Sequence, residues 1–189
     1  MAADTLASQS IINLDATTSP FLVAANTTGV GAPGAVRESS DYVSNTALGL
    51  QDTTSKYKMV RLPLYAKVKS IELSADARPD TGTALTVNVG AYWSDSAFDG
   101  TPANLQGTAI CTTAFASAVA FNASFRKVDV STAWSVANQN LPLWQALGLS
   151  ANAITGAPPA GFIDVVLAVQ AAATTGVATK IGARVTHVA

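Results

Sequence analysis

The glycine-rich segment Gly29–Gly34 is the first part of this chain that invites a chemical interpretation, because it has the letters GxGxxG of a dinucleotide-binding loop. That loop functions only between a strand and the N-terminus of a helix, which together hold a pyrophosphate. Here Pro33 lies inside the segment, and no helical apolar pattern follows it. We therefore interpret the segment as a linker and predict no cofactor.

His187 and Cys111 are the single histidine and the single cysteine of the chain. A catalytic triad holds its histidine between a nucleophile and a carboxylate, whereas Thr186–Val188 alternates like the end of a strand. One histidine and one cysteine cannot supply the ligands of a zinc site. Asp95 and Asp99 come closest to a calcium site, but turn-forming aspartates explain them better. We predict no metal site and no catalytic residue, and expect that the protein is not an enzyme.

The three tryptophans are the remaining candidates for a chemical role, because exposed aromatic rings stack on sugars. Trp93 and Trp144 occupy apolar positions of their own predicted elements, so we interpret both as core residues. The sequence leaves the role of Trp134 open. A carbohydrate-binding β-sandwich therefore stays one alternative function.

The charge content is low, at 12% of residues, against about 25% in ordinary soluble domains. This shortage favours a surface that is covered by partners, although an exterior rich in alanine, threonine and serine is an alternative explanation. The net charge is −1 and the basic residues are scattered, so we predict no nucleic-acid binding.

Apolar segments are too short to cross a bilayer. The best candidate, Ile163–Ala173, contains Asp164 and Gln170 and falls well short of the about 20 residues that a membrane-spanning helix needs. The first ten residues lack the basic segment and apolar run of a secretory signal. We expect no membrane partner.

Strands are the elements that must position these side chains. Apolar and polar residues alternate most clearly at Leu85–Trp93, as they do in a half-buried strand, and Gly-, Pro-, Asp- and Asn-rich turns separate this segment from others like it. The predicted strands are residues 57–62, 67–75, 84–93, 108–114, 125–130, 162–170 and 177–188. They indicate an all-β fold, an antiparallel β-sandwich or barrel of jelly-roll-like type.

One short helix interrupts the predicted strands at Leu141–Leu149, where Pro142 suits the first turn. Trp144 and Leu147 are three residues apart and share a helical face, so we expect them to anchor this helix in the sandwich. The last two strands flank Thr174–Gly176 and are predicted to form a C-terminal hairpin.

The chain divides into an extended N-terminal arm, residues 1–55, and a β-rich body, residues 56–189, because sustained periodicity is found only in the second part. A segment like the arm cannot build its own core, but its apolar patches can dock on a neighbouring surface. The candidate capsid or subunit contact anchors are Ile11, Ile12, Phe21, Leu22 and Val23. The alternative is a locally packed leader.

Four landmarks of the body carry a resemblance to a known class of protein. They are Met59–Val68, Asp80–Gly90, Leu143–Leu149 and Gly161–Val165, followed by the closing strands. In this order they resemble small virion structural proteins of tailed bacteriophages, of the capsid decoration or cement type. The resemblance covers about residues 56 to 188 and contains no catalytic motif.

The resemblance implies a β-rich module that is made in the host cytoplasm and binds the outside of the phage head. Its implied partners are the major capsid protein and further copies of itself, with a trimer expected first and a dimer second. Its implied role is to stabilise the capsid lattice. Another virion component, such as a tail, fibre or head-completion protein, is the alternative within the same class.

Overall fold

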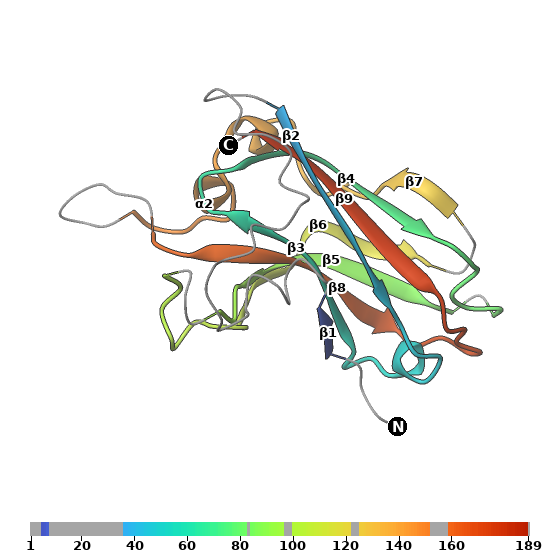
Figure 1. The fold of residues 1–189 in the computed structure, drawn as a ribbon. Coiled ribbons are helices and arrows are strands. Elements are labelled where there is room, and N and C mark those ends of the chain that lie inside the picture. The colour runs from blue at the N-terminus through green and yellow to red at the C-terminus, as the bar shows by residue number, and fades with distance from the viewer. Residues whose placement is uncertain are drawn as a thin grey trace, which may run out of the picture.

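Two β-sheets pack face to face in the computed structural model, which describes residues 5–7, 36–82, 84–96, 100–121, 125–151 and 159–188 (Figure 1). The five-stranded sheet contains, in spatial order, β1 (Thr5–Ala7), β3 (Lys56–Pro63), β8 (Phe162–Ala171), β5 (Thr86–Trp93) and β6 (Ala109–Ala120). The four-stranded sheet contains β2 (Val36–Ser44), β9 (Lys180–Val188), β4 (Lys67–Ala75) and β7 (Phe125–Asp129). Neighbouring strands are antiparallel, except for the parallel pair β1 and β3.

The hydrophobic core lies between the two sheets and follows the alternation of the strands. In β9, the side chains of Ile181, Ala183 and Val185 are buried, whereas the residues between them are partly exposed. In β5, Val87 and Val89 are buried in the same way. Successive side chains of a strand leave opposite faces, so each sheet presents one apolar face to the other. The predicted all-β antiparallel sandwich with one short helix is confirmed.

All seven predicted strands are present, and most have bounds close to those expected, although β6 continues to Ala120, well beyond its predicted end at residue 114. Two further strands among the described residues, β1 and β2, were not predicted. The more important is β2, which lies in the predicted arm and pairs with β9 along its whole length. Its sequence is mostly polar, and Val43 is its one fully buried residue, because an edge strand needs little apolar surface. Residues 36–55 therefore belong to the sandwich, and the other unpredicted strand, β1, also lies in the predicted arm and pairs with β3.

The predicted C-terminal hairpin is wrong. Strand β8 pairs with β3 and β5, whereas β9 pairs with β2 and β4, so the segment between them crosses from one sheet to the other. The Thr174–Gly176 segment looked like a hairpin turn because it is rich in turn residues. In the structure, a Cβ atom added to Gly176 would lie 2.2 Å from the carbonyl oxygen of Ala47, so the crossing requires glycine there.

The crossing is held by the buried carboxylate of Asp80. Its Oδ1 accepts hydrogen bonds from the backbone N–H groups of Gly82 and Thr175, at 2.9 and 3.0 Å, and its Oδ2 accepts one from Leu85 at 3.2 Å. Burial alone acts to raise the pKa of Asp80, but these backbone hydrogen bonds outweigh it and lower the pKa. One side chain thus joins the β8–β9 crossing to the turn before β5.

The helix is shorter than the one predicted at Leu141–Leu149, and its most deeply buried residue is Leu143. Helix α2 spans Leu143–Ala146, and Leu143 is fully buried. Trp144 and Leu147 also pack against the core, as predicted, but both stay partly exposed. The N–H groups of Leu143 and Trp144 donate to the carbonyl oxygens of Ala66 and Leu64, at 2.8 and 3.1 Å. These two bonds fasten the helix to the β3–β4 turn.

The edges of the sandwich differ in regularity. The pairing of β6 with β5 shifts register at three places, and Ala118 in β6 has a φ of 53°. The side-chain Oδ1 of Asn88 accepts the N–H of Ala118 at 2.9 Å and so holds one of these irregularities in place. A Cβ atom on Gly90 would lie 2.6 Å from the carbonyl oxygen of Thr112, so the backbone of β6 passes unusually close. By contrast, β2 and β9 pair over nine consecutive residues without a shift.

The burial of Leu143 generates a stability prediction. We expect Leu143→Ala to lower the free energy of unfolding by about 2–5 kcal/mol, as large-to-small changes in a packed core do. Trp144→Ala is the matched control on the same helix and should cost less, because part of the ring is exposed. Urea unfolding followed by circular dichroism measures both. A larger loss for Trp144→Ala would contradict this description of the helix.

The Asp80 hydrogen bonds generate a prediction about pH. Because the folded-state pKa of Asp80 is lowered, its contribution to stability is present above the unfolded pKa and is lost as the pH falls through the folded pKa. Asp80→Asn should cost about 1–3 kcal/mol at neutral pH, since an amide nitrogen cannot accept from N–H groups. The variant should also lose less stability than the parent protein between about pH 5 and pH 2. Asp76→Asn, at an exposed neighbouring position, is the control and should behave like the parent protein.

Candidate functional site

Several residues singled out in the sequence lie outside the described part of the structure. These are the contact anchors Ile11, Ile12, Phe21, Leu22 and Val23, the glycine-rich segment Gly29–Gly34, and Asp99. The anchor role of the first five stays a prediction.

His187 is a buried residue of β9, opposite Arg37 of β2 and Val68 of β4. Burial lowers the pKa of the imidazole, and the positive charge of Arg37 lowers it further, so the neutral form is favoured. Cys111 is exposed on β6, in the other sheet. Among the described residues, no three histidine, cysteine or acidic side chains are grouped so that they could hold a metal ion.

The three tryptophans differ in how deeply their side chains are buried. Trp93 is buried as expected, and Trp134 is buried too. The Trp134 ring lies 4.8 Å from that of Phe115, and its Nε1–H donates to the carbonyl oxygen of Val68 at 3.1 Å. Trp144 packs against the core, in keeping with its interpretation, and stays partly exposed. The three rings therefore do not form one exposed platform for a sugar.

Arg61 of β3 and Asp164 of β8 form a buried ion pair and lie opposite each other in the five-stranded sheet. The guanidinium Nε and Nη2 donate to the two carboxylate oxygens at 2.7 and 2.9 Å, and both side chains are almost completely buried. Burial raises the pKa of Asp164, and the hydrogen bonds and charge of Arg61 oppose that rise. All the acceptor oxygens of the carboxylate face a cation, so this pair is suited to holding strands together.

Asp95 extends the pair toward the surface. It follows β5 and interacts with Lys58 and, at 3.3 Å, with Nη2 of Arg61. Partial burial acts to raise the pKa of Asp95, but the hydrogen bond and charge of Lys58, with the charge of Arg61, outweigh it and lower the pKa. Lys58 and Arg61 share one face of β3 because the strand shifts register between Lys58 and Val60. We call Lys58, Arg61, Asp95 and Asp164 the cluster; it attaches the loop after β5 to the sheet.

Sequence reasoning did not find this cluster, since Arg61 and Asp164 are 103 residues apart. One signal was present in the sequence: Asp164 is an acidic residue inside the apolar run of β8. A buried acid in such a run requires a cationic partner. The partner could not be chosen from the sequence, because the pairing of β3 with β8 was not known.

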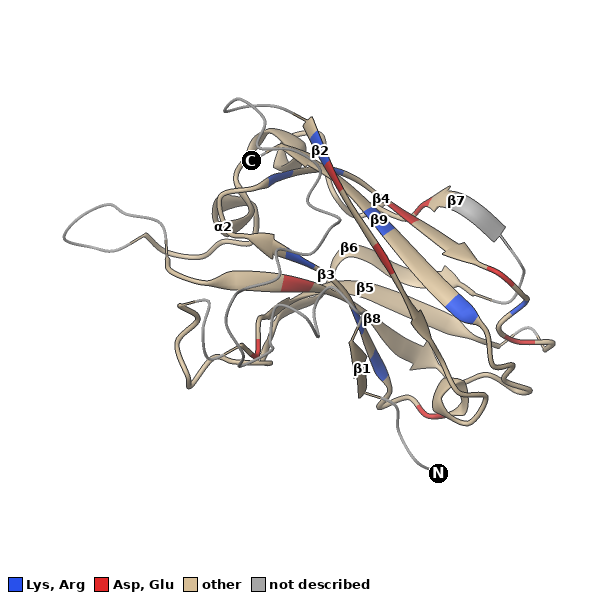
Figure 2. Cartoon of the chain, viewed as in Figure 1, with Lys and Arg blue, Asp and Glu red and all other residues tan. Residues whose placement is uncertain are grey.

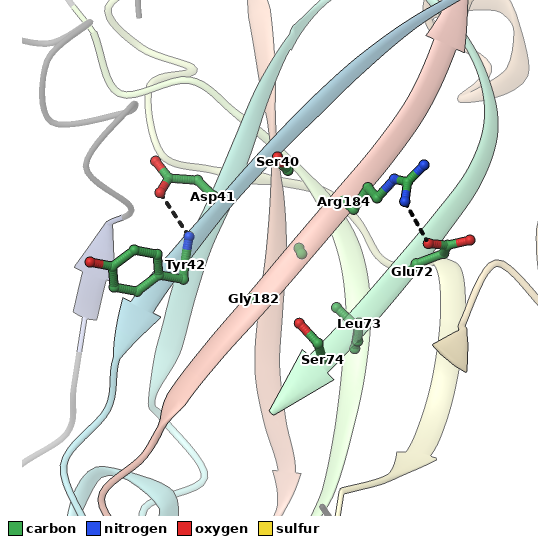
Figure 3. A pocket seen from close by; sticks show the side chains of 9 residues that line it. Ser40, Asp41, Tyr42, Glu72, Leu73, Ser74, Gly182 and Arg184 are labelled. Carbon is green, nitrogen blue, oxygen red and sulfur yellow. Dashed lines mark hydrogen bonds and ion pairs between the residues drawn. The ribbon is translucent and has the colours of Figure 1, made fainter. Parts of the chain in front are cut away.

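A shallow groove of about 440 Å³ lies on the outer face of the four-stranded sheet, across β2, β9 and β4 (Figure 3). The groove is lined by small residues, namely Ser40, Gly182 and Ser74. The longer side chain of Tyr42 borders it on the edge strand β2. Arg184 reaches from β9 toward Glu72 of β4, with 3.7 Å between the charged atoms (Figure 3). The register explains the depression, because Gly182 stands opposite Tyr42 on one side and Ser74 on the other.

Charges of both signs are mixed over the two sheets, and most of the ribbon carries none (Figure 2). Lys and Arg residues of the described ranges lie on several strands of the ribbon and not in one group in this view. No helix among the residues that the structure describes is long and apolar enough to cross a membrane.

No protein-family model matches the chain, and no curated protein matches it. A search of solved structures finds similarity to a chain of the cyanophage Pam1 capsid asymmetric unit. The two chains are 20% identical and superpose with a TM-score of 0.41, over 91% of this chain and 97% of the other. At this level of similarity, the chain is not assigned to a family.

The Arg61–Asp164 pair generates the prediction for this site. Asp164→Asn removes the buried counter-charge of Arg61 and leaves only the more exposed Asp95 carboxylate beside the guanidinium, so we expect a loss of about 3–5 kcal/mol in the free energy of unfolding. Asp95→Asn is the matched control, and it should cost about 1 kcal/mol or less because Asp95 is well exposed. Chemical unfolding at neutral pH measures both variants. Equal losses for the two would show that burial does not set the strength of this pair.

Proposed function

We propose that this protein is a structural component of a bacteriophage virion, which binds the outside of the head and stabilises the capsid lattice as a decoration or cement protein. Its partners are the major capsid protein and further copies of itself, with a trimer or a dimer as the assembly. The support comes from the resemblance of the body to such proteins and from the surface of the sandwich. No residue has to perform a chemical step.

The observation that carries the proposal is an apolar end of the sandwich, where α2 meets the β3–β4 turn. Tyr65 in that turn is 61% exposed, Val136 is 75% exposed and Leu141 is 38% exposed. Hydrogen bonds join the segments that carry these residues. Helix α2, just after Leu141, is bonded to the β3–β4 turn, which contains Tyr65. Nζ of Lys69 in β4 donates to the carbonyl oxygen of Gln139, in the segment between Val136 and Leu141, at 2.7 Å. We call Tyr65, Val136 and Leu141 the end surface.

Large apolar side chains on a surface with few charges are suited to contact with another protein. A protein that decorates a lattice needs only modest contacts, because neighbouring copies and repeated sites add avidity. It stabilises the shell by mass action, since it binds the assembled lattice and not its dissociated subunits. The rigid two-sheet core provides a stable support for such a surface.

The location of the protein is tested by quantifying it in purified virions against the major capsid protein. A copy number comparable with that of the major capsid protein supports decoration of the head. A few copies per particle would favour a tail, fibre or connector role, and absence from the particle would overturn the proposal.

The end surface generates a binding prediction. Tyr65→Glu and Leu141→Glu should each weaken binding to undecorated capsids by at least about tenfold, because a charge in an apolar contact costs more than 1.4 kcal/mol. Val128→Glu is the control, since Val128 is exposed on β7, at the opposite end of the sandwich from α2 (Figure 1). Co-sedimentation with capsids measures binding, and circular dichroism checks folding. If the control weakens binding while the end-surface variants do not, a different surface makes the contact.

The N-terminal arm generates a second binding prediction, now limited to residues before β2. Deletion of residues 2–35 removes the three-residue edge strand β1, but it should leave a folded body, because β2 and the buried core residues are retained. The truncated protein should bind capsids more weakly if the apolar anchors of the arm contact the shell or a neighbouring subunit. The same co-sedimentation assay applies. Binding as tight as that of the full chain would show that the arm is a passive leader.

A further inference from the structure

Strand β2 differs from the other edge strands of the described sandwich. The edge strand β6 is interrupted by three register shifts, β1 has three residues and β7 has five. Irregular or short edges are poor templates for another strand. Strand β2 is nine residues long and keeps an unbroken register with β9. It is therefore the edge best suited to pair with a further strand.

The backbone of β2 directs its even-numbered residues away from β9. The N–H of Asn45, just after the strand, donates to the carbonyl oxygen of Thr179 at 3.1 Å, so the odd-numbered residues bond toward β9. The N–H of Tyr42 instead donates to the Oδ1 of Asp41 at 2.8 Å. Backbone groups alternate sides along an antiparallel strand, so the even-numbered residues from Val36 to Ser44 face the outer edge.

The side chains of β2 have a pattern that is complementary to itself. Val36 is 69% exposed and Tyr42 is 52% exposed, and both lie on the outer face of the sheet. On the other face, Arg37 and Asp41 carry opposite charges. The two apolar residues and the two charged residues are placed symmetrically about Ser39. A strand with such symmetry can pair antiparallel with its own copy.

We propose that β2 pairs with β2 of a second copy of the chain around a two-fold axis at Ser39. In this register Val36 lies opposite the partner's Tyr42, Arg37 lies opposite the partner's Asp41, and each of these pairs occurs twice. The exposed apolar side chains cover each other, and the charges attract across the interface. The two four-stranded sheets become one continuous sheet.

Neighbouring registers lack this complementarity. The hydrogen-bonding pattern permits shifts of the residue pairing that keep even-numbered residues opposite each other. One such shift places Glu38 opposite its own copy, so that like charges meet. The shift in the other direction places Arg37 opposite Val43 and Val36 opposite Ser44, so both the charge pair and the apolar pair are lost. The register centred on Ser39 is therefore favoured.

The interface extends the proposed function, because it selects a dimer as the basic unit, but it does not depend on binding to a phage head. It also places the groove shown in Figure 3 next to its symmetry-related copy, since Ser40, Asp41 and Tyr42 line the groove on β2. A test in solution with the full chain therefore separates this inference from the decoration role. Failure of either one leaves the other intact.

Cross-linking tests the register. In a Cys111→Ser background, which removes the native thiol, Ser39→Cys should form a disulfide-linked dimer under mild oxidation. The two cysteines would form a non-hydrogen-bonded pair, whose Cα atoms lie about 4.5 Å apart and within disulfide range. Ser44→Cys is the matched control on the same strand and should stay uncrosslinked. Efficient cross-linking of the control, or none at Ser39→Cys, would overturn the proposed register.

Charge exchange tests the pairing without a covalent bond. Arg37→Asp and Asp41→Arg should each weaken the dimer at least tenfold in analytical ultracentrifugation, because each places like charges opposite each other. The double variant carries both exchanges and should restore the dimer. Circular dichroism confirms that the variants fold. A parent protein that is monomeric at about 100 µM, well above the micromolar range of modest interfaces, or a trimer unaffected by these changes, would contradict the proposal.

Discussion

The carboxylate of Asp80 is the interaction on which the arrangement of the two sheets depends. Strands β8 and β9 are neighbours in the sequence but belong to different sheets, so the chain between them must cross the open end of the sandwich. Asp80 accepts backbone hydrogen bonds from that crossing and from the turn before β5. Without this connection, the buried faces of β5, β8 and β9 would not be held in the same relative position, and the surfaces built on them would lose their geometry.

The polar groups of the interior have structural tasks, and the surfaces proposed for contact carry exposed apolar side chains. Arg61 and Asp164 satisfy each other inside the five-stranded sheet, and Asp95 adds the loop after β5 to the same cluster. The side chains that face solvent without such constraints include Tyr65 at the end surface and Val36 on β2. This division between buried charges and exposed apolar residues is consistent with the structural role proposed above.

Period-two alternation predicted most of the strands, because burial of one sheet face leaves a direct trace in the sequence. It failed where that trace is weak. Strand β2 is polar, since an edge strand buries little, and only the partner β9 defines it. The pairing of distant residues was also beyond the sequence, as the hairpin predicted at Thr174–Gly176 and the undetected Arg61–Asp164 pair show. Local patterns specify which segments are strands, whereas sheet membership depends on contacts between segments far apart in the chain.

In the proposed pairing through β2, the irregular edge at β6 would limit how far the protein can polymerise. Crowding many copies together raises the risk that exposed strand edges join into open-ended sheets. The shifts of register in β6, fixed by Asn88 and by the close backbone approach at Gly90, remove that edge as a template. A molecule with one regular edge can add one partner and then has no regular edge left to extend. Self-association that is closed in this way can reach high local concentration without forming fibres.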